Sequence, residues 1–189
     1  MATGDGQSPD TTCVDSLTNP VTDQEPSQRS EEMSGDVRAW VPRVTVATVV
    51  FDGERYLLVE EVAETGMPVL NQPAGHLEPG ESLMQAAVRE TLEESGWHVT
   101  IEALLGASLL TNAVTGITYY RTSFLARPDR HDPAHPLDPG IIGPRWLRYE
   151  EIIGSPSRLR SESVLATIEQ HRSGRRFPVD GFFYPESCV

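Results

Sequence analysis

GHLEPGESLMQAAVRETLEESGW, the stretch from Gly75 to Trp97, carries the clearest sign of both fold and function. Its second half has the composition of a helix, in which Glu93 and Glu94 follow Glu90 by three and four residues. Residues at that spacing share one face of a helix, so the three carboxylates are neighbours. No Lys or Arg lies three or four residues beyond any of them. Like charges so placed repel by roughly 0.2–0.5 kcal/mol per pair. Another interaction must therefore offset the repulsion among the three carboxylates.

The start of this helix is indicated by a turn and a cap. Residues 78–81, Glu-Pro-Gly-Glu, fit a type II turn, with Pro at the second position and Gly at the third. Ser82 and Gln85 then have the spacing of a capping box, so we expect the helix to begin there. On a helical projection Met84 and Val88 lie on the side that packs, whereas the three glutamates lie on the opposite side and collect charge.

Two interpretations of the charged face are open. Most charged helix faces are simply solvated. The missing cationic partners and the glycine-bearing loop before the helix favour a second interpretation, because three carboxylates at helical spacing suit a hard cation such as Mg²⁺ or Mn²⁺. We therefore predict that Glu90, Glu93 and Glu94 hold a divalent cation, whose charge offsets their repulsion.

Composition sets bounds on compartment and partners. The formal net charge is −13, and 38% of the residues are hydrophobic. Such an acidic chain lacks the basic surface that binds nucleic acid or anionic membranes. Cys13 and Cys188 lie near opposite ends and form no disulfide framework, and the first residues lack a signal peptide. We expect a cytoplasmic monomer or homodimer that acts on a small molecule and binds no nucleic acid and no membrane.

The 189 residues divide into three parts. Residues 1–40 contain eight acidic side chains, two arginines and few large apolar residues, so we expect a disordered acidic N-terminal tail. One folded domain is expected at residues 41–180, and a C-terminal tail at residues 181–189.

Strands are predicted by apolar and β-branched runs that are bounded by turn residues. Asp52-Gly53 between the first two runs is a strong hairpin signal, and a Pro-, Asp- and His-containing loop is expected between Pro128 and Pro144. Strands and helices do not alternate regularly, which favours a mixed α/β sandwich over a doubly wound sheet. The strands are predicted at residues 43–51, 55–61, 69–75, 97–110, 116–127 and 143–149, and a second helix at 161–174.

The opening stretch resembles a known signature. Written as G-x5-E-x7-R-E-T-x-E-E-x-G-W, it matches the 23-residue Nudix box at every charged and glycine position. Thr91 departs from the pattern, which usually has an aliphatic residue there, but its methyl group can still pack. The resemblance implies a Nudix hydrolase, with an α/β/α sandwich around a mixed β-sheet, that cleaves a diphosphate linked to another moiety.

The resemblance also implies roles for single residues. Matched position by position, the three glutamates would be the metal ligands, assisted by the Gly75 carbonyl. Arg89 would orient the glutamates through ion pairs, and Glu81 would join that network or bind metal. The catalytic candidates are thus Glu81, Arg89, Glu93 and Glu94. Glu93 and Glu94 are both candidates for the general base, and the sequence leaves the choice open.

Segments on either side of the box resemble the Nudix subgroup called phosphatase NudJ. These segments are VTVATVV, NQPAGHLEPGESL, RPDRHDP with a later RW, LRSE and HRSGRRFP. The resemblance implies release of phosphate from thiamine diphosphate and hydroxymethylpyrimidine diphosphate, and action on nucleoside di- and triphosphates. Two alternatives are open: a nucleoside triphosphate pyrophosphatase that clears damaged nucleotides, and a non-catalytic Nudix module that senses a nucleotide.

Substrate phosphates need cationic contacts that an acidic chain must supply locally. Arg43 and Arg121, both in predicted strands, are the candidates, although strand arginines are also common on surfaces. Tyr119, or its neighbour Tyr120, could stack on a pyrimidine ring, although an aromatic residue in a strand more often belongs to the core. A second metal site is not expected in the Pro-rich loop, in spite of its Asp129, His131, Asp132 and His135.

Overall fold

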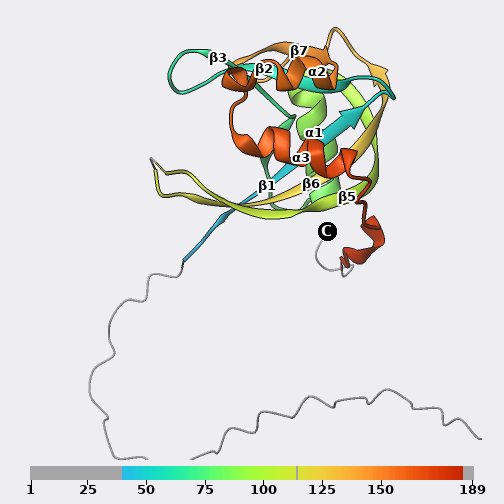
Figure 1. Ribbon diagram of the computed structural model, residues 1–189. Coiled ribbons are helices and arrows are strands. Elements are labelled where there is room, and N and C mark those ends of the chain that lie inside the picture. The colour runs from blue at the N-terminus through green and yellow to red at the C-terminus, as the bar shows by residue number, and fades with distance from the viewer. Residues whose placement is uncertain (1–39, 114, 185–189) are drawn as a thin grey trace, which may run out of the picture. The chain divides into compact units, whose positions relative to one another are not determined.

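A mixed β-sheet forms the centre of the protein (Figure 1). The structure, a computed structural model, describes residues 40–113 and 115–184. Within those ranges the sheet has seven strands, five of them in the order β3-β2-β1-β6-β5, while β4 pairs with β1 and β7 pairs with β2. The strands are β1 (Arg43–Phe51), β2 (Tyr56–Val62), β3 (Pro68–Asn71), β4 (Ala74–His76), β5 (Trp97–Thr111), β6 (Thr118–His131) and β7 (Ile141–Leu147).

The mixed character of the sheet comes from β1. This strand runs parallel to β6, with Arg43 opposite Tyr119 and Val50 opposite Ala126, and antiparallel to β2 and β4. Residues 45–50 are buried, as expected for a β-branched strand that is covered on both faces. The predicted α/β class with a mixed sheet is confirmed.

The predicted hairpin between the first two strands is present. Asp52 Oδ1 accepts a hydrogen bond from the N–H of Glu54 at 2.9 Å, and Gly53 has a φ of 102°, which a residue with a side chain rarely adopts. Val50 then pairs with Leu57 in antiparallel register. Local turn chemistry therefore sets how the chain enters β2.

Helix α1 (Leu83–Ser95) begins and ends where its sequence indicates. The N–H of Gln85 donates to Ser82 Oγ at 3.2 Å, and the N–H of Ser82 donates to Gln85 Oε1 at 2.7 Å, the two bonds of a capping box. Gly96 ends the helix with a φ of 69°. In the preceding turn, Gly80 has the positive φ that the third position of a type II turn requires.

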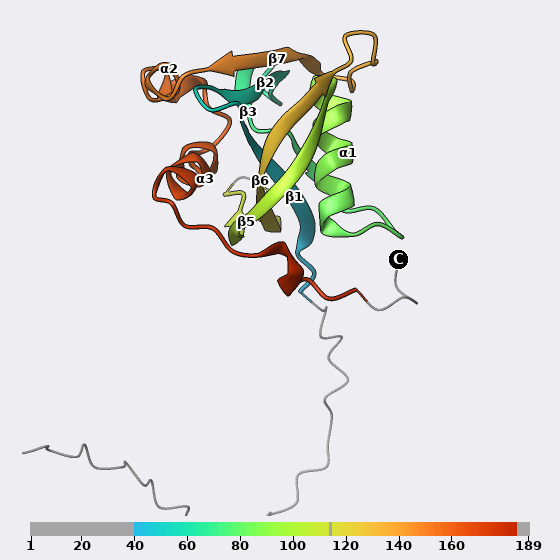
Figure 2. The ribbon, with the colours of Figure 1, turned by 90° about the vertical axis from the view of Figure 1, so that its right-hand side faces the viewer.

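Helices cover both faces of the sheet. Figure 2 shows α1 on one side and α3 on the other, and the core divides accordingly. Val46 and Phe124 pack with Ala86 and Ala87 under α1, whereas a larger cluster packs under α3. The remaining helical elements are α2 (Tyr149–Ile153), α3 (Glu162–Arg172) and two short 3₁₀ turns, Pro156–Arg158 and Val179–Gly181.

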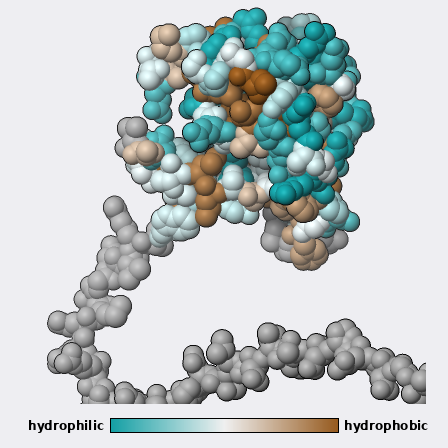
Figure 3. Space-filling view, in the orientation of Figure 1, coloured by the Kyte–Doolittle hydropathy of each residue, from teal (hydrophilic) through white to brown (hydrophobic). Residues whose placement is uncertain are grey.

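The surface in the orientation of Figure 1 is mainly hydrophilic, with small apolar patches between polar side chains (Figure 3). In the part of the chain that the structure describes, no helix is long and apolar enough to cross a membrane.

Three local features differ from the sequence prediction. Residues 69–75 form two short strands rather than one, and the carbonyl of Pro73 between them accepts the N–H of Thr48 at 2.9 Å. Strand β6 continues to His131 because it keeps pairing with β5, so the loop before β7 is shorter than expected. Helix α2 was not predicted, since five residues are too few to show a helical period.

The expected N-terminal tail lies outside the described residues, apart from Trp40, and so do residues 185–189. The described end of the chain contacts the domain. The ring centroids of Phe182 and Phe124 are 5.8 Å apart, and Tyr184 Oη accepts the first backbone N–H of α1 at 3.2 Å. Phe182 and Tyr184 therefore contact the sheet and α1, within the segment for which we expected a C-terminal tail.

Candidate active site

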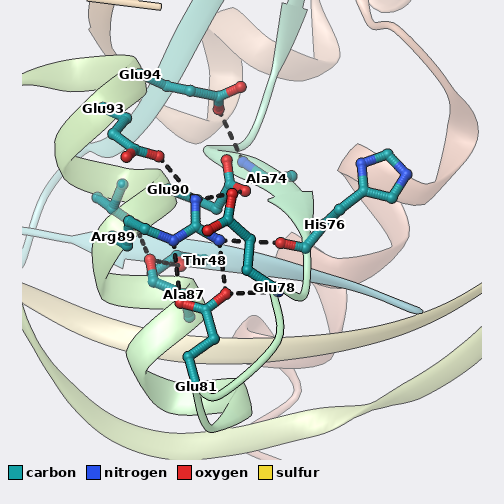
Figure 4. Close-up of polar contacts among 11 residues, drawn as sticks. Thr48, Ala74, His76, Glu78, Glu81, Ala87, Arg89, Glu90, Glu93 and Glu94 are labelled. Carbon is teal, nitrogen blue, oxygen red and sulfur yellow. Dashed lines mark hydrogen bonds and ion pairs between the residues drawn. The ribbon is translucent and has the colours of Figure 1, made fainter. Parts of the chain in front are cut away.

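Arg89 on α1 lies at the centre of a cluster of carboxylates (Figure 4). Its Nε and Nη2 donate to the two oxygens of Glu81 at 3.0 and 2.7 Å. Its Nη1 donates to Glu90 at 3.0 Å and to Glu93 at 2.8 Å. Arg89 therefore pairs with the glutamates as the resemblance implied, and it does so from a position that precedes them on the helix. Arg89 relieves part of the repulsion and fixes three carboxylates relative to one another.

The loop before α1 is held by the same arginine. Arg89 Nη2 donates to the carbonyl of His76 at 3.0 Å, and the N–H of Glu78 donates to Glu81 Oε1 at 2.8 Å. The hydrogen bonds from Arg89 lower the pKa of Glu81, and those to Glu81 raise the pKa of Arg89. Both groups are thus charged at neutral pH and form a fixed frame rather than a proton donor and acceptor.

Glu90 is buried against β4, with 8% of its surface exposed. A Cβ atom on Gly75 would overlap with the Glu90 carboxylate, so the strand can approach the helix only with glycine at this position. Burial raises the pKa of Glu90, the hydrogen bond from Arg89 opposes the rise, and the charges of Glu93 and Asp138 add to it. The carboxylate therefore lies where an added positive charge would be strongly favoured.

Glu94 is buried to the same degree, and its Oε2 accepts the N–H of Ala74 in β4 at 2.8 Å. Burial raises the pKa of Glu94 to about 8, the Ala74 bond opposes the rise, and nearby Glu61 and Glu90 add to it. The alternative of an ordinary solvated face therefore does not hold for Glu90 and Glu94. Strand β4 covers that side of α1.

Asp138 joins the cluster from the loop between β6 and β7. One oxygen each of Glu90, Glu93 and Asp138 lie within 4.8 Å of one another, and the N–H of Asp138 donates to the Glu93 carbonyl at 3.0 Å. We did not predict this residue, because a single Asp in a Pro-rich loop has no spacing that links it to a helix. Its Asp-Pro-Gly context indicated only a turn.

The chemistry of these donors fits a hard divalent cation. The side chains that converge here offer carboxylate oxygens, the ligands that Mg²⁺, Mn²⁺ and Ca²⁺ prefer. The missing side chain of Gly75 lets the Glu90 carboxylate lie directly against β4. Both observations point to a cation at the junction of α1, β4 and the loop that carries Asp138.

Arg121 lies in β6 and is electrostatically coupled to the cluster. Its Nη2 donates to Gln72 Oε1 at 2.9 Å, whereas its Nε is buried without a hydrogen-bond partner among the described residues. Burial lowers the pKa of Arg121 to about 10, and the negative charges of Glu94 and Glu61 oppose that effect. A guanidinium with an unused donor thus lies close to two carboxylates, unlike an ordinary surface arginine.

Arg43 and Tyr119 face each other across β1 and β6, two residues from Arg121 along the strand. Arg43 and His76 border an open hollow of about 560 Å³, and the ring centroids of Tyr119 and His76 are 6.2 Å apart. Tyr119 is partly buried and Tyr120 is 42% exposed, so neither ring lies in the core. The strand pairing therefore brings all three predicted substrate residues to one end of β1 and β6.

His131 and Asp129, at the start of the predicted Pro-rich loop, have other contacts. His131 stacks on Trp97 with ring centroids 4.9 Å apart, and Asp129 pairs with Arg127 and Thr100. Within residues 40–113 and 115–184, the one group of side chains with metal-binding spacing is that of Glu90, Glu93 and Asp138.

Three comparisons with known proteins agree with one another. The family model described as NUDIX domain matches residues 41–167. Phosphatase NudJ of Escherichia coli strain K12 is 37% identical over 139 residues, which cover 74% of this chain and 89% of that protein. A NUDIX hydrolase structure from Nitrosomonas europaea is 42% identical, with a TM-score of 0.75, and the match covers 77% of this chain and 98% of that one. The E. coli ORF135 protein shares the fold: it is 24% identical, with a TM-score of 0.56, and the match covers 70% of this chain and 92% of that one.

Proposed function

The chain belongs to the Nudix hydrolase family, and from this premise we propose that it is a metal-dependent phosphatase that releases orthophosphate from organic diphosphates. Nudix hydrolases cleave diphosphate bonds in small molecules, and this chain is such a hydrolase. The proposed substrates are thiamine diphosphate, hydroxymethylpyrimidine diphosphate and nucleoside di- and triphosphates. The carboxylate cluster around Arg89, close to the buried Arg121, is the observation that carries the proposal.

The proposed cofactor is Mg²⁺, with Mn²⁺ as a substitute. Glu90, Glu93, Glu94 and the Gly75 carbonyl would hold the ion, and Asp138 lies close enough to Glu90 and Glu93 to add an oxygen. When bound, the ion would neutralise charge on the diphosphate and acidify a water molecule. The converging oxygen donors and the close approach of Glu90 to β4 at Gly75 support this assignment.

The other residues of the site would position carboxylates and substrate. Arg89 and Glu81 hold the glutamates in one arrangement through charge-assisted hydrogen bonds. Arg121 would donate its unpaired Nε to a substrate phosphate. Arg43 would contact the outer end of the substrate, and Tyr119 would stack on its ring.

A carboxylate must accept the proton of the attacking water. The Glu93 side chain is 34% exposed, and one of its oxygens bonds to Arg89. Glu94 is buried and bonds to the backbone of β4. We therefore assign proton acceptance to Glu93. The water would attack the terminal phosphorus, and the bond from that phosphorus to the bridging oxygen would break, leaving the organic monophosphate.

The relatives and the charge of the chain support a small-molecule substrate. The E. coli relative is named a phosphatase, which favours orthophosphate over pyrophosphate as the product. The net charge of −13 disfavours nucleic acid and anionic membranes as partners. We infer a cytoplasmic enzyme that acts as a monomer or homodimer.

A product assay tests this function. The protein is incubated with Mg²⁺ and each proposed substrate, and orthophosphate and pyrophosphate are measured separately. We expect orthophosphate from every diphosphate, and stepwise loss of single phosphates from a nucleoside triphosphate. Glu93→Gln serves as the inactive control. Pyrophosphate as the main product from a triphosphate would contradict the proposal and favour a housecleaning pyrophosphatase.

A further inference from the structure

The segment between α2 and α3 sends two arginines to neighbouring residues of β2. Arg158 Nη2 donates to Glu60 Oε1 at 2.7 Å, and Arg160 Nη1 donates to Glu61 Oε1 at 3.1 Å. Because neighbouring residues of a strand point to opposite faces, Glu60 and Glu61 leave β2 on opposite sides. Glu60 also accepts bonds from Arg145 of β7 at 2.9 and 2.6 Å, so that its pair links three elements of the fold.

Glu61 is the member of this pair that is coupled to the candidate active site. Burial is the main cause of the raised pKa of Glu94, and the negative charge of Glu61 adds to the rise. Burial likewise lowers the pKa of Arg121, an effect that Glu94 and Glu61 oppose and to which Arg160 adds. The Glu61 side chain is only 14% exposed. A carboxylate in this position would repel a substrate phosphate, and its ion pair with Arg160 offsets that repulsion.

The backbone places Arg160 near Arg121. The N–H of Arg160 donates to the Leu70 carbonyl at 2.9 Å, and Leu159 pairs with Leu70 in a parallel bridge. Gln72, which accepts the bond from Arg121 at 2.9 Å, follows Leu70 by two residues. Two residues of extended chain span at most about 7 Å. Both arginines are therefore attached to one short stretch of chain, residues 70–72.

Arg160 keeps donors for a ligand. A guanidinium has five N–H donors in a planar fork, and the bond to Glu61 is the one hydrogen bond that this side chain makes to residues 40–113 and 115–184. The Arg160 side chain is 42% exposed, so a ligand can reach it. Arg121 has its own unused donor, the buried Nε. Two guanidiniums with free donors suit an anion that has two phosphoryl groups.

We propose that Arg160 is a substrate-binding residue that acts together with Arg121, each guanidinium contacting one phosphoryl group of the diphosphate. Glu61 holds Arg160 in place for this contact. The proposal rests on the proposed function, because it needs a diphosphate at the carboxylate cluster. The contact is to phosphate alone, so it strengthens binding whatever organic group the diphosphate carries.

Arg160→Gln tests the proposal, and Arg158→Gln is the matched control. Arg158 makes the same kind of ion pair from the same segment, and Glu60 keeps its bonds from Arg145 in that variant. The probe is methylenediphosphonate, a non-hydrolysable diphosphate analogue without an organic group, and its Kd is measured by calorimetry with saturating Mg²⁺. We expect Arg160→Gln to raise this Kd by about tenfold or more, and Arg158→Gln by less than about twofold.

Steady-state kinetics give a second readout. Arg160→Gln should raise KM by similar factors for thiamine diphosphate and for a nucleoside diphosphate, and should change kcat by less than about threefold, because the lost contact is made to the bound substrate and to the transition state alike. A rise in KM for one of the two substrates only would contradict a contact to phosphate.

An unchanged Kd in Arg160→Gln, or an equal rise in both variants, would overturn the role of Arg160 and leave the proposed function standing. Thermal midpoints check folding. Arg160→Lys replaces Arg160→Gln if that variant does not fold; its Kd should also rise, because an ammonium cannot reproduce the planar fork, and an unchanged Kd would overturn the proposal. If the wild type releases no orthophosphate, the proposed function is wrong. The Kd comparison still decides the role of Arg160, and absent binding by the wild type overturns it.

Discussion

Gly75 is the residue at which β4 comes closest to α1. Its missing side chain leaves room for the Glu90 carboxylate, and the next residue toward the N-terminus, Ala74, donates its N–H to Glu94. The backbone of a three-residue strand therefore positions two of the three box glutamates. The site is sensitive to small changes in this strand, although the strand itself carries no charged side chain.

Gly75→Ala should weaken metal binding without unfolding the protein. The added methyl group would displace Glu90, and lost supporting contacts of this kind lower metal affinity by about 10- to 100-fold. The affinity for Mn²⁺ is measured by calorimetry. Gly181→Ala is the matched control, because a Cβ atom there meets nothing within 4 Å. Wild-type affinity in Gly75→Ala would show that Glu90 is not a ligand.

Gln72→Leu should raise KM for diphosphates more than it lowers kcat. Gln72 is buried and accepts a hydrogen bond from Arg121, and a bond to a charged group contributes about 1.5–3 kcal/mol. We expect a KM about tenfold higher in steady-state assays. Gln72→Glu keeps an acceptor for Arg121 but loses the donor to Val164, so its KM should lie closer to that of the wild type. Equal KM values for Gln72→Leu and wild type would show that Gln72 does not contribute to substrate binding.

At the scale of elements, α1 packs against the central sheet on one side and against β4 on the other. Ala86 packs against Val46 and Phe124, while Glu90 and Glu94 face β4. The capping box and the first hairpin could be predicted, because each depends on residues close in sequence. The burial of Glu90 and Glu94 under β4 could not be predicted, because it depends on the pairing between β1 and β4. The position of Asp138 could not be predicted either, because the tertiary fold brings its loop next to Glu90 and Glu93.

Helix α3 carries a buried histidine that makes stability depend on pH. His171 Nδ1 is 2.9 Å from Tyr56 Oη, and its Nε2 is 3.3 Å from Arg176 Nη2. Burial, and then the charges of Arg176 and Arg172, lower the pKa of His171 below its usual 6.5. Below that pH the unfolded chain takes up a proton that the folded protein resists, so this contribution to stability is lost as the pH falls toward the folded-state pKa.

His171→Gln should flatten that dependence. At about pH 7.5 the variant should be less stable than the wild type by about 1–2 kcal/mol, because packing and the contact with Tyr56 are lost. At about pH 5.5 the difference should be smaller, because the wild type then bears the cost of its unprotonated histidine. The free energy of unfolding at both pH values, from urea titrations, checks this. If the variant and the wild type differ in free energy of unfolding by the same amount at both pH values, His171 is not the source of the pH dependence.

At the scale of the whole molecule, the charge of −13 is distributed unevenly. Residues 1–40 have eight acidic side chains and two arginines, a charge of −6, which leaves −7 for the remaining residues. Arg89, Arg121 and Arg43 contribute positive charge near the site, and Arg160 adds to it through its pair with Glu61. Anionic substrates are therefore attracted by local groups against the overall field of the protein.

Deletion of residues 1–38 should leave the thermal midpoint and the turnover nearly unchanged. Their polar and acidic composition cannot bury enough apolar surface to offset the entropy of ordering them. Calorimetric scans and steady-state assays of the shortened and full-length chains make the comparison. A clear drop in the midpoint of the shortened chain would mean that the segment contributes to the folded domain.

Our central claim is that Glu90, Glu93 and Glu94 on α1 hold the divalent cation on which hydrolysis depends. The most direct measurement is orthophosphate release from thiamine diphosphate by the wild type and by Glu94→Gln, in excess EDTA and with increasing Mg²⁺. Glu94→Gln keeps an oxygen for the N–H of Ala74 and should retain the thermal midpoint. We predict no release by the wild type in EDTA, recovery with Mg²⁺, and release at least about 100-fold slower in the folded variant. Undiminished release in excess EDTA, or by Glu94→Gln, would contradict the claim.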